Sequence, residues 1–496
     1  MTKRNDPIIR ILVLIWAVGG LLCTGLAAQE DVVGSVVKVY ADQYPYSYES
    51  PWRLDSPTSV TGSGAVISGN RVLTSAHVVA DAKFIQVKRA GSDKKFAAEV
   101  EIIANECDLA VLRVTDAAFF AGADALAVGT LVSLRDPVTV YGFPEGGEEL
   151  STTEGIVSRI EIRGYRHSLN WLLCGQIDAA INPGSSGGPV IKDEKIVGIA
   201  FQAGRGQNIS YMVPAPVIDH FLEDIKDGKY DGIPSLEVAW QEIENEAHAA
   251  ELGLKPGQSG IMVSVVHPGS PVESLIKPGD VILALDGNRI AGDGSVEFRR
   301  NERTLYYYYV QKHFLGDTLD LDILRAGRGM KIPIKLTVPI SSTRLVPFSQ
   351  HDVQPSYFIV GGLIFQKLTA NYIELFGDRE APSDLQGLLL YGEPTPERKN
   401  IVVLCGVLAD EINVGYETLF ETAIYKANGR NVASLPDLVA AVESNTGPRH
   451  VFVNSAGKEV VIDRQKAEAR KDLILKRYKV DSDRSEDLKA KAGAKG

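Results

Sequence analysis

Short apolar segments separated by turn residues fill the chain from residue 32 to about residue 218. They are rich in β-branched residues and are interrupted by Gly, Asn and Pro, a pattern typical of a β-barrel or a β-sandwich. The clearest predicted strands are residues 64–68, 110–114, 138–142 and 195–200. A helical pattern at 216–225 closes this region, and residues 226–234 are predicted to form a linker.

Two further units follow, at residues 235–340 and 345–465, and they share a local pattern. In the first of them, an apolar strand at 281–285 enters an Asp-Gly turn, and an earlier strand is predicted at 260–266. In the second, residues 424–432 repeat the arrangement with an Asn-Gly turn. Because Asx-Gly turns favour β-hairpins, both units are predicted to contain β-hairpins.

A helix is predicted directly after the second of these turns. Ser434 can cap a helix over 435–442, and Asp437 in its first turn is favourably placed for the helix dipole. Residues 466–496 are highly charged and are predicted to be a tail, with one helix at 472–478 and a disordered end.

The N-terminus has the three parts of a secretory signal. Lys3, Arg4 and Arg10 are basic, an apolar run follows, and Gly25-Leu-Ala offers a cleavage site with small residues. Residues 1–28 are therefore predicted to be a signal peptide, and the periplasm or another exported location is expected. The alternative is a signal anchor in the inner membrane, because the run is just long enough to span a bilayer.

Composition narrows the class of protein. Lys and Arg total 52 and Asp and Glu total 63, which gives a net charge of −11 and argues against general nucleic-acid binding. Beyond the signal, the cysteines are Cys107, Cys174 and Cys405, and no CxxC spacing suggests a zinc site. They are predicted to be small buried apolar residues.

The most informative segment is Gly184-Ser-Ser-Gly-Gly-Pro. A serine nucleophile needs a tight turn that exposes its Oγ and aims backbone N–H groups at the oxyanion of a tetrahedral intermediate. Ser186 is the candidate nucleophile, and the amides of Gly184 and Ser186 are the candidate oxyanion hole. Read alone, the segment is also compatible with an ordinary Gly/Ser loop.

Two other segments supply the missing chemistry. His77 follows a predicted strand and can act as general base toward Ser186. Asp108 stands at the start of an apolar strand, where a buried carboxylate can orient His77 and stabilise its imidazolium. A lone histidine or aspartate is usually structural, but the three together follow the chain order of chymotrypsin-type proteases.

These segments resemble the trypsin-like serine peptidases and, more narrowly, the HtrA/Deg family. The matching segments are 62–64, 74–77, 108–111, 142–144, 176–189 and 197–200. The family usually has Asn before the nucleophile, whereas this chain has Ser185. Since the side chain at that position does not perform the attack, we expect activity to survive the difference.

The resemblance implies a mainly β protein with four parts after the signal. It implies a chymotrypsin-like double β-barrel protease domain at 29–232, a PDZ domain at 235–340, a divergent PDZ-like domain at 345–465, and the charged tail at 466–496.

It also implies where substrates bind. The substrate is expected to lie as an extra strand beside Ala200, Phe201 and Gln202. Ile181 and Tyr211 are expected to line a pocket that prefers small or medium apolar P1 residues. In the first PDZ domain, the segment of Ser259, Gly260, Ile261 and Met262 aligns with the loop that holds a peptide's terminal carboxylate. Residues 306–309, four consecutive tyrosines, are expected on the helix beside this groove.

Residues 40–59, 355–360 and 485–488 resemble the plant Deg9-type branch of the family. In that branch the third unit packs on its neighbour rather than taking substrate, so it is interpreted as an assembly domain. The resemblance implies a homo-oligomer, a trimer or a hexamer.

The sequence therefore predicts an exported, ATP-independent serine endopeptidase that degrades unfolded or misfolded proteins. The expected partners are unfolded polypeptides and peptide C-termini. No metal, nucleotide or organic cofactor is expected, because the chemistry needs none and neither a Walker loop nor an HExxH motif is present. The alternative is a chaperone or scaffold that uses the protease fold with an inactive resting site.

Overall fold

The computed structural model describes residues 32–204, 208–377, 380–395, 397–419 and 421–489. The predicted signal peptide lies outside the described residues. The chain divides into two compact units. The first comprises Met1–Gln43, Thr58–Arg166 and Leu173–Tyr230, and the second comprises Tyr44–Pro57, His167–Leu172 and Asp231–Gly496.

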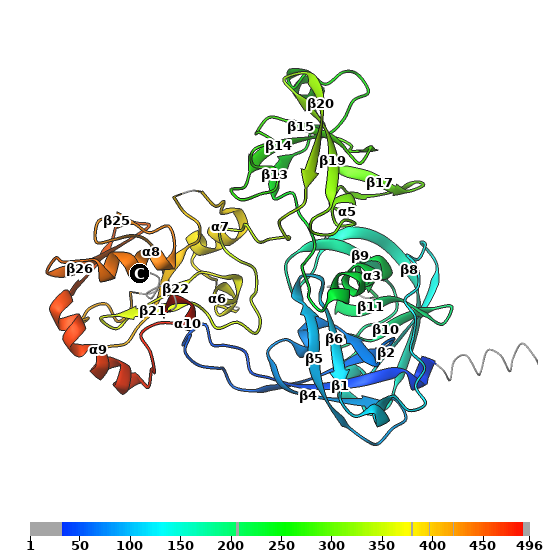
Figure 1. The fold of residues 1–496 in the computed structure, drawn as a ribbon, viewed down its shortest axis with the longest axis horizontal. Coiled ribbons are helices and arrows are strands. Elements are labelled where there is room, and N and C mark those ends of the chain that lie inside the picture. Colours follow the sequence, from blue (N-terminus) through cyan, green and yellow to red (C-terminus); the bar gives the residue numbers. More distant parts are fainter. Residues whose placement is uncertain (1–31, 205–207, 378–379, 396, 420, 490–496) are drawn as a thin grey trace, which may run out of the picture. The chain divides into compact units, whose positions relative to one another are not determined.

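The first unit contains two closed six-stranded barrels, as the strand pattern and the resemblance predicted (Figure 1, blue to green). The first barrel has the order β1-β2-β3-β6-β5-β4. Its strands are β1 (Val36–Gln43), β2 (Thr58–Ile67), β3 (Arg71–Thr74), β4 (Ala82–Arg89), β5 (Phe96–Ala104) and β6 (Leu109–Val114). Alternate residues Val37, Val39 and Ala41 of β1 are at most 2% exposed and enter one core, as the period of two in a strand requires.

The second barrel has the order β10-β11-β12-β9-β8-β7. Its strands are β7 (Pro137–Gly142), β8 (Ser151–Gly164), β9 (Trp171–Ile177), β10 (Pro189–Lys192), β11 (Lys195–Ala203) and β12 (Ser210–Pro214). The helices of this unit include α2 (Ala76–Val79) and α3 (Ala215–Asp224), with the 3-10 helices η1 (Asn105–Cys107), η2 (Ala117–Phe120), η3 (Pro144–Gly146) and η4 (Ile225–Asp227). The helix α3 is the one predicted at 216–225.

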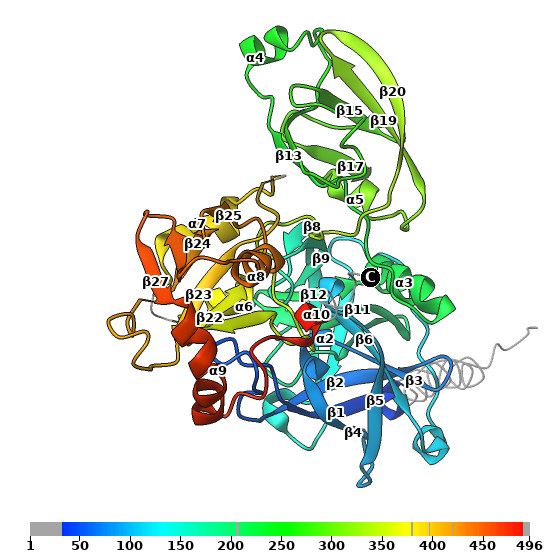
Figure 2. The ribbon, with the colours of Figure 1, turned by 60° about the vertical axis from the view of Figure 1, so that its left-hand side comes forward.

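Residues 231–340 form an antiparallel sheet of order β13-β14-β15-β19-β20, in which β19 and β20 are the longest strands (Figure 2). Its elements are β13 (Val238–Gln241), α4 (Glu246–Glu251), β14 (Ile261–Val266), β15 (Val281–Leu285), β16 (Asn288–Arg289), β17 (Ser295–Arg299), β18 (Glu302–Leu305), α5 (Tyr307–Val310), β19 (Thr318–Arg325) and β20 (Arg328–Lys335). The predicted Asp-Gly turn joins β15 to β16, and both of its residues have positive φ, 46° and 77°.

Residues 345–489 also belong to the second compact unit and are the third unit of the sequence analysis, a name that is kept for them below. Their sheet has the order β21-β22-β23-β24-β26-β27. Its elements are β21 (Tyr357–Val360), β22 (Leu363–Lys367), α6 (Ala370–Glu374), α7 (Ser383–Tyr391), β23 (Val402–Val407), β24 (Thr422–Ala427), β25 (Arg430–Asn431), α8 (Leu435–Glu443), β26 (Arg449–Asn454), β27 (Glu459–Asp463), α9 (Arg464–Tyr478) and α10 (Glu486–Lys489). The Asn-Gly turn joins β24 to β25 just as the Asp-Gly turn joins β15 to β16. The Ser434 side chain caps α8 by accepting a hydrogen bond from the Asp437 N–H, as predicted.

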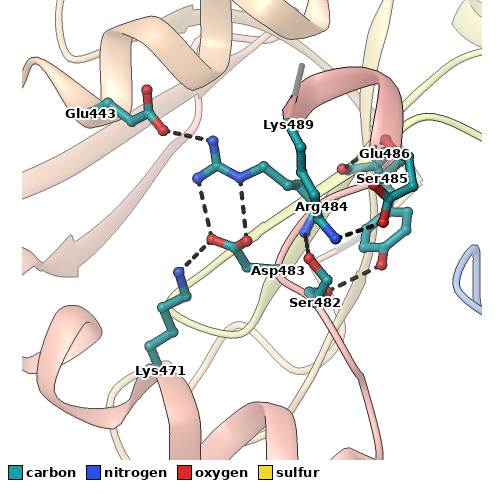
Figure 3. Close-up of polar contacts among 9 residues, drawn as sticks. Glu443, Lys471, Ser482, Asp483, Arg484, Ser485, Glu486 and Lys489 are labelled. Carbon is teal, nitrogen blue, oxygen red and sulfur yellow. Dashed lines mark hydrogen bonds and ion pairs between the residues drawn. The ribbon is translucent and has the colours of Figure 1, made fainter. Parts of the chain in front are cut away.

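The charged C-terminal segment is part of the third unit rather than a separate tail. In α9, Ala467 and Ile474 are 4% and 1% exposed and join its apolar clusters, and Leu488 of α10 is also buried there. Between the two helices the backbone pairs with β21, since the Ile359 N–H donates to the Asp483 carbonyl at 2.7 Å. Figure 3 shows the ion pairs that hold this segment, in which Arg484 bridges Asp483 and Glu443. The expected boundary at 465 is therefore too early.

The insert at 44–57 leaves the barrel and packs with the third unit. The Gln366 Nε2 donates to the Tyr48 carbonyl at 2.7 Å, and the rings of Trp52 and Tyr357 meet edge to face at 5.8 Å. All three cysteines of the described chain are buried and unpaired, which confirms the sequence prediction. Within that part of the chain, no helix is both long and apolar enough to cross a bilayer.

Candidate active site

His77 and Asp108 form a tight pair at one end of the first barrel. The strands β3 and β6 that precede and follow them are neighbours, with Thr74 opposite Ala110, so residues distant in sequence meet in space. The His77 Nδ1 lies 2.8 Å from Asp108 Oδ2 and 3.0 Å from Oδ1. The His77 backbone N–H also donates to Asp108 Oδ1 at 2.8 Å. Asp108 itself is only 1% exposed, its φ of +55° lies in the left-handed region, and its carboxylate is held by these hydrogen bonds from His77.

The electrostatics of this pair suit a general base. Burial by itself would lower the pKa of His77, but the charge of Asp108 and its hydrogen bond outweigh burial and raise that pKa above the ordinary 6.5. The imidazolium is therefore stabilised, which is what a base requires once it has taken a proton. The His77 side chain remains 30% exposed, so the ring is accessible.

Ser186 lies in a turn that packs against the segment leading to His77. The Ser63 N–H donates to the Ser186 carbonyl at 2.7 Å. A Cβ on Gly187, whose φ is +84°, would collide with the Ser63 carbonyl and would lie 2.9 Å from the Ser75 nitrogen. Glycine is therefore required at position 187, where the Ser186 turn contacts Ser63 and Ser75, and Ser75 lies two residues before His77. The structure brings Ser186 and the His77–Asp108 pair into one region of the protease unit.

The turn leaves two amides unused. The Ser185 N–H donates to the Asn182 carbonyl at 2.9 Å and the Gly187 N–H to the Ala200 carbonyl at 2.7 Å. Across the residues that the structure describes, the N–H groups of Gly184 and Ser186 have no hydrogen-bond partner. Two such amides in one turn are the donors that an oxyanion hole needs.

The predicted substrate strand is the C-terminal half of β11. Its pairing with β10 ends at Ile199, so the edge beyond Ala200 is not covered by β10. The register with β12 skips Phe201, and the Phe201 carbonyl lies 3.5 Å from Ser186 Oγ. Ala200 is fully buried, and the Gln202 Oε1 accepts a hydrogen bond from the Arg166 N–H at 3.0 Å.

The two predicted pocket residues come from neighbouring segments and are both buried. Ile181 and Tyr211 are 5% and 4% exposed, and the Ile181 N–H donates to the hydroxyl of the adjacent Ser210 at 3.1 Å. The Arg163 guanidinium lies 4.4 Å from the Tyr211 ring centroid. Phe201 packs on Tyr165 with ring centroids 4.5 Å apart.

Ser63 is a contributor that the sequence reasoning missed. Its Oγ donates to the Gly184 carbonyl at 2.7 Å and accepts from the Phe143 N–H at 3.0 Å, and the side chain is fully buried. It therefore fixes the Gly184–Ser185 peptide, which lies between the two candidate oxyanion donors. The Gly-Ser-Gly motif at 62–64 indicates the family, but its local pattern does not predict a partner for Ser63 at Gly184, 121 residues away.

The carboxylate loop expected at residues 259–262 does not fit the sheet order. Ile261 and Met262 belong to β14, which lies between β13 and β15, so no peptide strand can be added beside them. Ser259 instead donates to the Ile290 carbonyl at 2.8 Å, and a Cβ on Gly260 would collide with the Ile282 carbonyl. The sequence predicts strands but not their order, which is why the assignment failed.

One edge strand of this sheet is β13, and the other is β20. A cavity of about 200 Å³ adjoins β13 and is lined in part by Leu236, Val238, Tyr307 and Val310. The Trp240 Nε1 of β13 donates to the Tyr307 hydroxyl at 2.9 Å, so α5 lies beside this edge. Of the four tyrosines expected on that helix, residues 307–309 lie in α5 and Tyr306 is its N-cap residue.

Comparisons with known proteins agree with the geometry. A trypsin-like peptidase domain model matches residues 62–199, and a PDZ domain model matches residues 346–487. The chain is 37% identical over 466 residues to Protease Do-like 2, chloroplastic, of Arabidopsis thaliana, with 92% of this chain and 75% of the relative covered. It is 36% identical over 452 residues to Protease Do-like 4, mitochondrial, of the same plant, with 91% and 84% covered.

The chain belongs to the HtrA/Deg family. It is a trypsin-like serine protease of the HtrA/Deg type, a mainly β protein with a barrel-containing protease domain followed by a PDZ domain. A solved structure of a variant of the HtrA-type protease AlgW with a decapeptide has the same fold, with a TM-score of 0.51 at 23% identity, over 64% of this chain and 98% of the other.

One finer expectation is not supported. The similar relatives include the plant Do-like proteases 2, 3 and 4, at 35% to 37% identity, and they do not point specifically to the Deg9-type branch.

Proposed function

We propose that this HtrA/Deg protease is an ATP-independent endopeptidase in which Ser186 is the nucleophile, His77 the general base and Asp108 the residue that orients it. The observation that carries the proposal is the coincidence of a 2.8 Å His77–Asp108 pair with two unused amides in the Ser186 turn. The first supplies a base and the second supplies a charge-stabilising site, and nucleophilic catalysis needs both.

The steps follow from these positions. The Ser186 Oγ bonds to the scissile carbonyl carbon while its proton passes to His77 Nε2, and Asp108 stabilises the imidazolium. The amides of Gly184 and Ser186 donate to the oxyanion. The C–N bond then breaks as His77 returns the proton to the leaving amine. Water, activated by His77, hydrolyses the ester and releases Ser186.

Unfolded polypeptides are the proposed substrates, because only an extended chain can pair with the β11 edge at Phe201 and Gln202. Buried Ile181 and Tyr211 favour small or medium apolar P1 side chains. We also propose that the protein is exported by a signal peptide at residues 1–28. The alternative is that this segment stays as a signal anchor. Mass spectrometry that identifies the N-terminal residue of the mature protein decides between cleavage and anchoring.

The two C-terminal units are proposed to be PDZ domains with different roles. In the first, the open edge β13 and the cavity beside α5 suit a peptide C-terminus. In the third unit, β21 covers the outer side of β22, and the chain's own residues 483–485 pair with β21. That edge is occupied, so the third unit is assigned to assembly of a trimer or hexamer.

Labelling with a fluorophosphonate probe tests the protease assignment against the scaffold alternative. We expect the wild-type protein to be labelled at Ser186, because the probe needs both an activated serine and an ordered oxyanion hole. Ser185→Ala is the matched control and should label normally, whereas Ser186→Ala should not. Failure of the wild-type protein to label, with its fold intact by circular dichroism, would favour the scaffold.

Peptide binding to the first PDZ domain is tested with the full chain carrying Ser186→Ala, so that the ligand is not cleaved. A fluorescent peptide with an apolar C-terminus is expected to bind, and amidation of that C-terminus should weaken binding about 10- to 100-fold, because charge-assisted hydrogen bonds to the carboxylate are lost. Fluorescence anisotropy gives both dissociation constants. Equal affinity for the free and amidated peptides would contradict carboxylate capture.

A further inference from the structure

A buried lysine stands in the first barrel, close to the oxyanion turn. Lys38 of β1 is 1% exposed, although its neighbours Val37 and Val39 are the apolar residues expected there. Its Nζ donates to the Gly146 carbonyl at 2.7 Å and to Glu148 Oε1 at 2.8 Å. A buried ammonium group is costly unless it is paired and hydrogen-bonded. The burial of this ammonium group therefore indicates a functional role for Lys38.

The segment that Lys38 holds is the one on which the oxyanion turn rests. Gly146 ends the 3-10 helix η3, and the preceding Glu145 N–H donates to the Pro183 carbonyl at 2.5 Å. A Cβ on Gly184 would collide with the Phe143 carbonyl and would lie 3.2 Å from the Gly146 nitrogen. The orientation of the peptide between Pro183 and Gly184 is thus set by residues 143–146.

The barrel contacts this segment from two adjacent strand positions. Lys38 is directly opposite Ser63 in the β1–β2 register, and Ser63 hydrogen-bonds Phe143 and Gly184 as described above. Ser63 therefore fixes the start of the segment and Lys38 fixes its end. Both contacts come from the first barrel, whereas the oxyanion turn belongs to the second.

Glu148 keeps the ammonium group of Lys38 paired. Lys38 is also opposite Lys88 across β1 and β4, and such like charges repel unless an anion lies between them. Glu148 forms ion pairs with both lysines, and its side chain is 61% exposed. Hydrogen bonds from Lys38 and then Lys88 lower the pKa of Glu148 to about 2, so the carboxylate stays ionised wherever His77 can act as a base.

We propose that Lys38 is a positioning residue for the oxyanion hole, acting through Gly146 and Glu148 on the Pro183–Gly184 peptide. The inference rests on the proposed function, because it presupposes that the amides of Gly184 and Ser186 bind the oxyanion. It predicts a contribution to transition-state stabilisation from a side chain that touches no reacting atom.

Lys38→Met tests the proposal, because methionine fills similar space without a charge or a donor. Removing an oxyanion donor costs about 10²- to 10³-fold in kcat, and loosening the donors should cost less. We expect kcat for a peptide substrate to fall about 10- to 100-fold, with KM changed by no more than about twofold. Lys88→Met is the matched control, since Lys88 contacts Glu148 but not Gly146, and its kcat should stay near the wild-type value.

A pair of inhibitors separates positioning from general damage. A peptidyl trifluoromethyl ketone forms a charged hemiketal with the serine, whereas the matching alcohol binds the same subsites without an oxyanion. Lys38→Met should lower the affinity for the ketone inhibitor by the same factor by which it lowers kcat. The affinity for the alcohol should stay unchanged. Equal weakening of both inhibitors, or no loss of kcat, would overturn the proposal.

Glu148→Gln covers the case in which Lys38→Met does not fold. The exposed Glu148 side chain can be changed without opening the core, and a smaller loss of about 3- to 10-fold in kcat and ketone affinity is expected, because Lys38 keeps its bond to Gly146. If the ratio of the affinities for the ketone and the alcohol is the same in this variant as in the wild-type protein, the proposal is also rejected. A wild-type protein that forms no hemiketal would instead show that the proposed function is wrong.

Discussion

Replacing Asp108 with asparagine is expected to lower kcat about 10⁴-fold while KM for a peptide changes little. The amide keeps the shape of the side chain, so the fold should persist. It removes the charge that stabilises the His77 imidazolium, and an amide NH₂ facing Nδ1 favours the tautomer in which Nε2 carries the proton and cannot accept one from Ser186. Steady-state kinetics on a peptide substrate measures the effect.

The pH profile gives the same variant a second readout. In the wild-type protein Asp108 raises the pKa of His77, so activity is lost on the acid side as His77 becomes protonated below that pKa. Without the carboxylate the pKa of His77 falls, and the acid limb of kcat/KM should move to lower pH.

Asp116→Asn is the control for this prediction, because it makes the same chemical change at an exposed carboxylate that caps η2. It should leave both kcat and the acid limb unchanged. A value of kcat for Asp108→Asn within tenfold of the wild-type value would contradict the role of Asp108.

The order of strands explains most of what the sequence could and could not predict. Local patterns predicted the barrel strands, the Asx-Gly turns and the Ser434 cap, because each depends on residues close together in the chain. The carboxylate loop at Ser259–Met262 failed because its suitability depends on which strand lies outside β14, and no local pattern carries that information.

Two other features escaped for related reasons. In the sequence, Lys38 is a single charged residue among apolar residues. The residues around it do not indicate its partners Gly146 and Glu148, which are more than 100 residues away. The helix predicted at 472–478 is the C-terminal part of α9, but its packing in the third unit was not predicted. The helix buries only Ala467 and Ile474, seven residues apart, so its apolar stripe is too narrow to indicate a buried face in a charged segment.

Replacing Ser186 with alanine is expected to have the largest effect of all, a loss of about 10⁶-fold in kcat for a peptide and no detectable cleavage of casein. The variant removes the Oγ and its weak contact with the Phe201 carbonyl at 3.5 Å, so the fold and substrate binding should be retained. The amides of Gly184 and Ser186 remain, which leaves only the small residual rate that an oxyanion hole supports alone.

The decisive comparison is with the double variant. Because Ser186 and His77 act as one unit, adding His77→Ala to Ser186→Ala should cause almost no further loss. Ser185→Ala is the matched single control and should retain casein cleavage, since Ser185 holds the turn through its backbone. Its N–H donates to the Asn182 carbonyl, and its carbonyl accepts from the Gly188 N–H. Casein cleavage by Ser186→Ala at the wild-type rate, or a full additional loss in the double variant, would show that the nucleophile lies elsewhere.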